Sequence, residues 1–434
     1  MLRRWFVLSG VFVLVVAVTA VAARSFLFSH GGHTVNSVGR SSAVPWRMPA
    51  GSQRGTMRWR AVPSVSFHCH APFGSQYDIT EGTLNDVAAT GPDDAWAVGV
   101  CGSSGTRGGY GRTSEGEVEH WDGKRWSAAH IPGGAEYDLV AAGSPGNVWA
   151  AGTPSGQGAA VDALAVIHWG GRQWTWAAAG LPSSATITAL SATPTTAWSL
   201  VDPSDGGNSA SEVFRWSGSR WAQVDAPKGF HFNGGGDTQP RGGDGLLTAD
   251  KTGGVWVGGS LGPHATRPAI AHYNGSSWNI EPLPIPRRTS LGGMVIMGNG
   301  VWAVAEAFGT TTGGREPFGI GAVFHPGRTF AEQWDGAHWT RLPPPPQAGL
   351  GQVFGDGFGH VWVSGSGAWA LWDGERWETS KSGWPPPYPP DPSHAPNRGP
   401  GFIFAPVPGS SAIWGVGAND FLNGHPQIVT AGTP

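Results

Sequence analysis

The sequence predicts an all-β fold, a seven-bladed β-propeller whose blades each consist of four antiparallel strands. Three observations support this prediction. A tryptophan motif recurs seven times, a second aromatic motif alternates with it, and the composition is rich in turn residues and aromatics but poor in charge. Radial repetition of four-stranded sheets is the defining pattern of this architecture. A solenoid of stacked hairpins is the rival arrangement.

The composition excludes several classes of protein. Of 434 residues, 70 are Gly and 36 are Pro, together about a quarter, near the level at which disorder becomes plausible. However, 24 Trp argue against disorder, because disordered chains lack aromatics. Gly and Pro spread along the whole chain exclude a coiled coil or helical bundle. The formal net charge of −3, with no basic stripe, excludes a general nucleic-acid binder.

The first motif is a Trp that follows a small or apolar residue and is closely followed by small residues, as in Ala95-Trp96-Ala97-Val98-Gly99. Successive copies are 53, 49, 58, 46, 60 and 52 residues apart. A period of this length is typical of propellers and solenoids. The repeated tryptophans, called the strand-two tryptophans below, are Trp96, Trp149, Trp198, Trp256, Trp302, Trp362 and Trp414.

The second motif reads Trp121-Asp122-Gly123-Lys124-Arg125-Trp126 in its first copy. Asp-Gly, Asn-Gly, Gly-Gly and Ser-Gly pairs favour tight hairpin turns because positive φ is easily adopted there. The motif therefore predicts a turn between strands three and four, with aromatics paired across it. The six copies begin at Trp121, Trp169, Trp216, Tyr273, Trp334 and Trp372.

The missing seventh copy of this motif favours a ring over a solenoid. After Trp414 the chain has a third strand at Gln427–Thr430 and then ends. Gly55–Pro63 precedes the first repeat and resembles a fourth strand. A ring closes when such a strand completes the last blade, whereas a solenoid has no use for it. We therefore expect Met57–Val62 to complete blade seven.

The N-terminus predicts export. Arg3 and Arg4 precede Trp5–Ala23, 19 residues without a charge that end in small residues. This is either a cleaved signal peptide or an uncleaved helical anchor, and both readings place the rest of the chain outside the cytoplasm. The expected organisation is a signal or anchor at 1–23, a flexible tether at 24–50 and the propeller at 51–434. We expect a monomer that is either secreted or held by this single membrane helix.

The repeats resemble a known group of proteins. Ser144-Pro145-x-Asn147-Val148-Trp149-Ala150-x-Gly152, followed by His168-Trp169-x-Gly171-x-x-Trp174, is similar to the Trp-rich propeller repeats of exported bacterial proteins. These are grouped loosely with Asp-box, YVTN and WD-repeat propellers. The resemblance covers about residues 55–434 and implies the fold. An Asp-box places its Asp two residues before the Gly, whereas Asp122, Asp335 and Asp373 directly precede theirs. This departure weakens the inference of sialidase activity, and a sialidase-like propeller remains the alternative function.

The loops predict which face binds. Turns one-to-two and three-to-four are short and repetitive, whereas the loops of the opposite face vary, notably 101–117, 228–245, 306–330 and 380–400. Function concentrates on variable loops held by a rigid scaffold. Trp384 and Tyr388 flank a stiff proline run and are candidates to contact a ligand; packing over the gap between blades six and seven is the alternative. Further loop candidates, with packing or solvent exposure as their alternative, are Tyr110, Phe230, His231, Phe308 and Arg315.

The only two cysteines are Cys69 and Cys101. In an exported chain they predict a disulfide, which would pin the closing strand to blade one. A metal site of His68, Cys69, His70 and Cys101 is the rival, but its spacing is not a common zinc pattern. His120, His168 and His272 occupy one repeat position, and equivalent positions in different blades point apart. We therefore expect a repeat-consensus role for them, and no metal or cofactor.

Two function classes remain. The first is a non-enzymatic binding module or scaffold for a glycan or a protein at the cell surface. The alternative is a carbohydrate-active hydrolase or lyase that uses the loop face. Acidic residues such as Glu306, Asp237 or Asp244 that meet an Arg in one pocket, with carboxyls about 5–9 Å apart, would favour the enzyme. The dispersed turn carboxylates cannot form such a pair.

Overall fold

A computed structural model describes the propeller region, with gaps in most of its variable loops. The described residues are 59–64, 80–103, 114–133, 135–154, 164–203, 211–232, 246–262, 266–287, 289–297, 300–307, 310–312, 323–325, 327–346, 350–356, 360–365, 368–379, 402–418 and 426–432. The chain divides into two compact units, Met1–Ser42 and Ala43–Pro434. All described residues belong to the second unit, in which every regular element they form is a strand.

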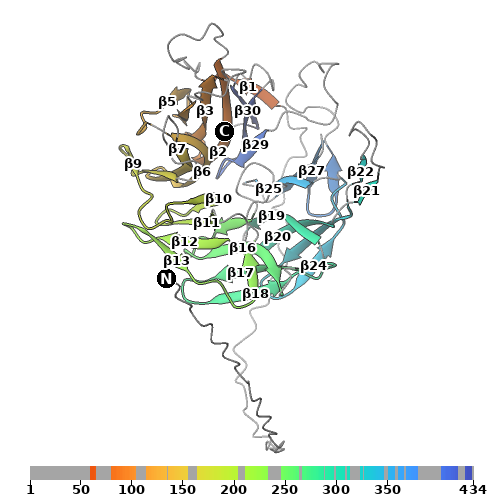
Figure 1. Cartoon of the computed structure of the whole chain (residues 1–434). Coiled ribbons are helices and arrows are strands. Elements are labelled where there is room, and N and C mark those ends of the chain that lie inside the picture. The colour runs from red at the N-terminus through yellow and green to blue at the C-terminus, as the bar shows by residue number, and fades with distance from the viewer. Residues whose placement is uncertain are drawn as a thin grey trace, which may run out of the picture. The chain divides into compact units, whose positions relative to one another are not determined.

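Seven sheets follow one another along the chain, from the orange strands to the blue ones (Figure 1). All strand pairs in them are antiparallel. Blade one contains β2 (Thr80–Gly91), β3 (Asp94–Ser103), β4 (Ser114–Trp121) and β5 (Trp126–Ala128). Blade two contains β6 (Ala135–Ser144), β7 (Asn147–Pro154), β8 (Ala165–Trp169) and β9 (Trp174–Trp176). Blade three contains β10 (Ala185–Ala192), β11 (Ala197–Pro203), β12 (Glu212–Trp216) and β13 (Trp221–Val224).

The later sheets repeat this order with one exception in blade four. Its strands are β14 (Phe230–Phe232), β15 (Leu247–Ala249), β16 (Val255–Leu261), β17 (Arg267–Tyr273) and β18 (Trp278–Pro282). Blade five contains β19 (Thr289–Met297), β20 (Gly300–Ala307), β23 (Thr329–Trp334) and β24 (Trp339–Leu342). Blade six contains β25 (Leu350–Gly355), β26 (Val361–Gly365), β27 (Ala368–Trp372) and β28 (Trp377–Thr379).

Blade seven joins the two ends of the described chain. It contains β29 (Ile403–Pro406), β30 (Ile413–Ala418), β31 (Pro426–Ala431) and β1 (Trp59–Val62). Trp59 lies opposite Ala431 and Val62 opposite Ile428. The expected closing strand starts two residues earlier, and Met57 and Arg58 are not among the described residues. Strand β2 of blade one contacts both β29 and β30 of blade seven.

Two predicted loops contain strands. In blade four, β14 and β15 pair with opposite ends of β16, with His231 opposite Ser260 and Thr248 opposite Trp256. The innermost strand is therefore interrupted by residues 233–245 rather than preceded by one long loop from residue 228. In blade five, β21 (Thr310–Thr312) and β22 (Val323–His325) form an antiparallel pair within the 306–330 loop.

The strand-two tryptophans lie between neighbouring blades. The ring of Trp149 in blade two lies 4.9 Å from Trp216 and 5.2 Å from Trp221 in blade three. Trp96 contacts Trp169 and Trp174 of blade two in the same way, and Trp414 contacts the aromatic pair of blade one. Aromatic pairs add about 0.5–1.5 kcal/mol each beyond the area they bury. The tryptophan therefore recurs once per blade because each blade needs one such contact with the next blade.

The three-to-four turns have the expected geometry. All six turn glycines have positive φ, from 88° to 100°, and the aromatics on either side of each turn have ring centroids 5.1 to 6.0 Å apart. In blade one, Asp122 Oδ1 accepts hydrogen bonds from the backbone N–H groups of Lys124 and Arg125, both at 2.9 Å. The hydrogen bonds to Asp122, led by that from Arg125, lower the pKa of this carboxyl. Asp335 and Asp373 make the same contacts in their own turns.

Candidate functional site

A Trp–His–Asp arrangement recurs at the end of the blades that carries the one-to-two turns. His120 lies opposite Trp96 in the β3–β4 ladder, and the two rings stack with centroids 4.1 Å apart. Nε2 of His120 lies 2.7 Å from Asp94 Oδ1. Asp94 also accepts a hydrogen bond from the Thr90 hydroxyl. Asp94 ends the one-to-two turn, so this arrangement ties the turn to strand three.

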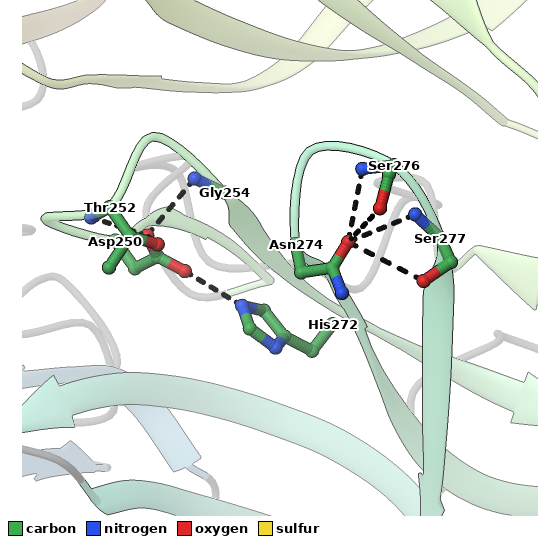
Figure 2. Close-up of polar contacts among 7 residues, drawn as sticks. All are labelled: Asp250, Thr252, Gly254, His272, Asn274, Ser276 and Ser277. Carbon is green, nitrogen blue, oxygen red and sulfur yellow. Dashed lines mark hydrogen bonds and ion pairs between the residues drawn. The ribbon is translucent and has the colours of Figure 1, made fainter.

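Blade four repeats the arrangement with a different turn (Figure 2). His272 stacks on Trp256 at 4.1 Å with an interplanar angle of 8°. Its Nε2 lies 2.7 Å from Asp250 Oδ2, while Asp250 Oδ1 accepts from the backbone N–H groups of Thr252 at 2.8 Å and Gly254 at 3.0 Å. Burial opposes ionisation of Asp250, but these hydrogen bonds outweigh it and lower the pKa. The adjoining Asn274 turn is held separately through Ser276 and Ser277.

Blades two and six contain variants of this arrangement. In blade two, Asn147 Oδ1 accepts from Trp149 Nε1 at 2.9 Å and lies 2.8 Å from His168 Nε2, and burial lowers the pKa of His168. In blade six, the histidine comes from the turn itself: His360 Nδ1 lies 2.5 Å from Asp356 Oδ2. The hydrogen bond that His360 donates to Asp356 raises the pKa of His360.

These histidines belong to four different sheets and each binds a partner in its own sheet. No group of three or more His, Cys, Asp or Glu in the described part of the chain could hold a metal ion. The arrangement resembles the His–Asp half of a catalytic triad, but the face of each imidazole is covered by an indole in three of the blades. The Trp–His–Asp arrangement therefore has a structural role: it links the one-to-two turn to strand three. This agrees with the repeat-consensus role expected for His120, His168 and His272.

Sequence reasoning did not find the acidic partners of these histidines. Asp94 and Asn147 stand two residues before their strand-two tryptophans, whereas Asp250 and Asp356 stand six residues before theirs. The varying offset hides the pattern in the sequence. The available signal was the co-occurrence of a turn Asp or Asn with a His opposite the tryptophan.

Three acidic side chains outside this arrangement accept hydrogen bonds, one of them from a neighbouring blade. Asp86 Oδ2 accepts from the backbone N–H of Val140 in blade two at 2.8 Å. Glu119 is fully buried in blade one, where its Oε1 accepts from the Ser64 hydroxyl at 2.8 Å. Glu306 Oε1 accepts from the backbone N–H of Gly327 at 3.1 Å within blade five. Asp237 and Asp244, the other two acids considered for catalysis, fall in a gap of the described chain.

Most of the residues predicted to contact a ligand lie outside the described residues. Phe230 and His231 are described and lie in β14. Phe230 is 5% exposed and packs against Phe232, which is the packing alternative considered for it. His231 is half-buried opposite Ser260. The candidates outside the described residues are Tyr110, Phe308, Arg315, Trp384 and Tyr388.

Two further sequence features concern covalent chemistry. Gly258-Gly259-Ser260-Leu261-Gly262 matches the pattern of a nucleophile elbow, which requires a sharp strand-to-helix turn. Ser260 instead lies inside β16 and is 6% exposed, so it is not such a nucleophile. Cys101 is 6% exposed near the end of β3, and the described residues contain no free cysteine. Cys69 is not described, so the Cys69–Cys101 bond remains a prediction.

Comparison with known proteins supports no family assignment. No protein-family model matches the sequence, and no curated protein matches it. A solved structure of YCF48 bound to D1 peptide is 14% identical, with a TM-score of 0.48, and covers 89% of this chain and 97% of its own. An α-L-arabinanase from Penicillium chrysogenum complexed with arabinobiose is 12% identical, with a TM-score of 0.39 and coverages of 86% and 96%. The β-propeller domain of the Trilobed protease from Pyrococcus furiosus is 9% identical, with a TM-score of 0.37 and coverages of 69% and 97%.

Proposed function

We propose that this chain is a non-enzymatic propeller that acts outside the cytoplasm and binds a glycan or a protein at the cell surface. The observation that carries the proposal is the use of its acidic side chains. Asp94, Asp250 and Asp356 hold histidines, and Asp122 and its equivalents hold turns. Glycoside hydrolysis requires two carboxyls about 5–9.5 Å apart across one bond, whereas these acids are committed within separate sheets.

The binding surface belongs, in this proposal, to the face of the variable loops. The three-to-four turns of blades one, four, five and six repeat the same pair of side-chain-to-backbone hydrogen bonds, so that face presents similar structure several times. The opposite face differs in every blade, and unique loops on a rigid scaffold are where specific recognition is usually found. Trp384 and Tyr388 are the first candidates for ligand contact, followed by Tyr110, His231, Phe308 and Arg315.

Export is also part of the proposal. The uncharged segment 5–23 would direct the chain out of the cytoplasm, either as a cleaved signal or as an anchor. In the described part of the chain, no helix has the length and apolar character needed to cross a membrane, and segment 5–23 lies outside that part. The Cys69–Cys101 disulfide and the pairing of β1 with β31 would together close the ring under oxidising conditions.

A binding screen tests the proposal. The full oxidised chain, and a variant with Trp384→Ala and Tyr388→Ala, would be applied to a glycan array and to cell-wall fractions. Binding by the parent that is lost in the variant supports recognition on the loop face. Release of reducing sugar from any glycan that binds would replace the proposal with the hydrolase alternative, and retention of cell-surface proteins without glycan binding would identify a protein ligand.

A further inference from the structure

Two arginines lie over the same aromatic ring at the loop-face end of blade five. The guanidinium carbons of Arg328 and Arg341 are 5.5 and 5.7 Å from the ring centroid of Phe330. Phe330 is 6% exposed, whereas both arginines are exposed. Phe330 lies in β23, and Arg328 directly precedes that strand. We call Arg328 and Arg341 the arginine pair.

Arg341 is held in place by two bonds. Its Nε donates to Glu332 Oε1 at 2.7 Å, and its Nη2 donates to the carbonyl of Pro284 in the connection between β18 and β19. Glu332 is 1% exposed, and burial raises its pKa although the bond from Arg341 opposes that shift. A guanidinium has five N–H donors, so three remain for a ligand. A side chain already ordered loses less entropy when it binds.

Arg328 is positioned by its backbone, and its guanidinium lies over the Phe330 ring. Its carbonyl accepts from the N–H of Ala307 at 2.9 Å, which fixes the start of β23 beside β20. No carboxylate among the described residues pairs with its guanidinium. Cation–π attraction to the ring does not require a hydrogen bond from the guanidinium N–H groups. The arginine pair therefore offers two oriented sets of donors and two positive charges.

The backbone around the pair offers few donors of its own. Pro343–Pro346 follow Arg341 after Leu342, and Pro284 and Pro286 lie in the neighbouring connection between β18 and β19. Proline lacks an N–H, so the segment that follows β24 has no backbone donor to offer an anionic ligand. Recognition at this place would depend on the guanidiniums, whose planar fork matches carboxylate, sulfate and phosphate groups.

We propose that the arginine pair binds the carboxylate or sulfate groups of an acidic polysaccharide. This inference rests on the proposed binding function and supplies its ligand chemistry. Charge-assisted contacts on an exposed surface weaken as salt screens them, so binding should fall with ionic strength.

The test uses the full chain, with polygalacturonate as the carboxylated probe and heparin as the sulfated one. Arg328→Gln removes the guanidinium that makes no ion pair with a carboxylate among the described residues. A Glu332→Gln and Arg341→Gln double variant removes the other without leaving a buried carboxylate unpaired. Arg172→Gln, in the exposed three-to-four turn of blade two, is the matched control for loss of one charge. Poly-glutamate and inorganic sulfate are the competing probes.

We expect each of the two pair variants to bind the preferred polysaccharide about tenfold more weakly, while Arg172→Gln binds as the parent does. Equal binding by Arg328→Gln and the parent would overturn this site and leave the proposed function intact. Binding of neither polysaccharide, or tighter binding of poly-glutamate, would also overturn it. Full competition by sulfate at the same molar concentration of charge would show that the pair recognises a free ion only. Failure of the proposed function would appear separately, as loss of all binding on the glycan array and in the pull-down.

Discussion

Ser64, two residues after the N-terminal strand β1, donates a hydrogen bond at 2.8 Å to Glu119, a fully buried glutamate in blade one. The bond links the segment that leaves blade seven to strand β4 of the first blade. At the other end of β1, Trp59 makes a T-shaped contact with Phe404 of β29, with ring centroids 5.1 Å apart. The N-terminal segment therefore contacts blade seven through Trp59 and blade one through Ser64.

Removing the Ser64 hydroxyl should loosen this attachment. We expect Ser64→Ala to lower the free energy of unfolding by about 1 kcal/mol, because a buried carboxylate loses a donor. Urea unfolding followed by tryptophan fluorescence measures the effect. Ser184→Ala, an exposed serine before β10, is the control, and equal stability of the two variants would contradict the role given to Ser64.

The strand-two tryptophans should carry much of the stability. Trp149 is fully buried between blades two and three, whereas Trp176 is 53% exposed. We expect Trp149→Ala to cost about 3–5 kcal/mol, since a large cavity forms between blades. Trp176→Ala should change stability by less than about 0.5 kcal/mol. Thermal or urea unfolding of both variants checks the contrast, and similar losses in both would refute it.

The His360–Asp356 pair should make stability depend on pH. The pKa of His360 is raised from 6.5 by its bond to Asp356. Its contribution is therefore complete below pH 6.5 and disappears as pH rises through the raised pKa. Burial opposes the charge on Asp356, but His360 outweighs it and lowers that pKa from 3.8. On the acid side the contribution therefore starts to fall below pH 3.8.

Measurement of unfolding free energy across pH for the parent and His360→Gln tests this dependence. The difference in unfolding free energy between the parent and His360→Gln should be largest between about pH 4 and 6.5 and shrink in alkaline solution. A parent–His360→Gln difference that grows with rising pH would contradict the assignment.

His168 is expected to show the opposite pH dependence, because burial lowers its pKa from 6.5. The stability linked to His168 should be complete above pH 6.5 and decline below it.

One turn contains a matched pair of glycines. Gly171 has a φ of +88°, whereas Gly170 beside it has no positive φ and open space where a Cβ would stand. We expect Gly171→Ala to cost about 1–2 kcal/mol because an L-residue is strained at positive φ. Gly170→Ala should stay within about 0.5 kcal/mol of the parent. The free energy of unfolding of both variants, measured by chemical denaturation, tests this contrast. A Gly171→Ala variant as stable as the parent would argue against strain in this turn.

The repeat architecture could be predicted because its determinants are local. The seven strand-two tryptophans and the six turn glycines each act within a few residues of sequence, and period and turn chemistry therefore show them directly. The split inner strand of blade four could not be predicted in this way. Phe230–Phe232 is only three residues long and pairs with β16 across an intervening segment, so nothing in its own sequence distinguishes it from the loop around it.

The sequence by itself determined the seven units, the four-strand order within each and the position of every three-to-four turn. Only the tertiary structure decided which side chains meet. Asp94 with His120 and Glu332 with Arg341 are brought together by strand pairing. Arg341 approaches Phe330 only when β23 and β24 lie side by side. The physical reason is that periodicity reports which residues face the core, whereas contacts between charged groups depend on register and on the geometry of neighbouring blades.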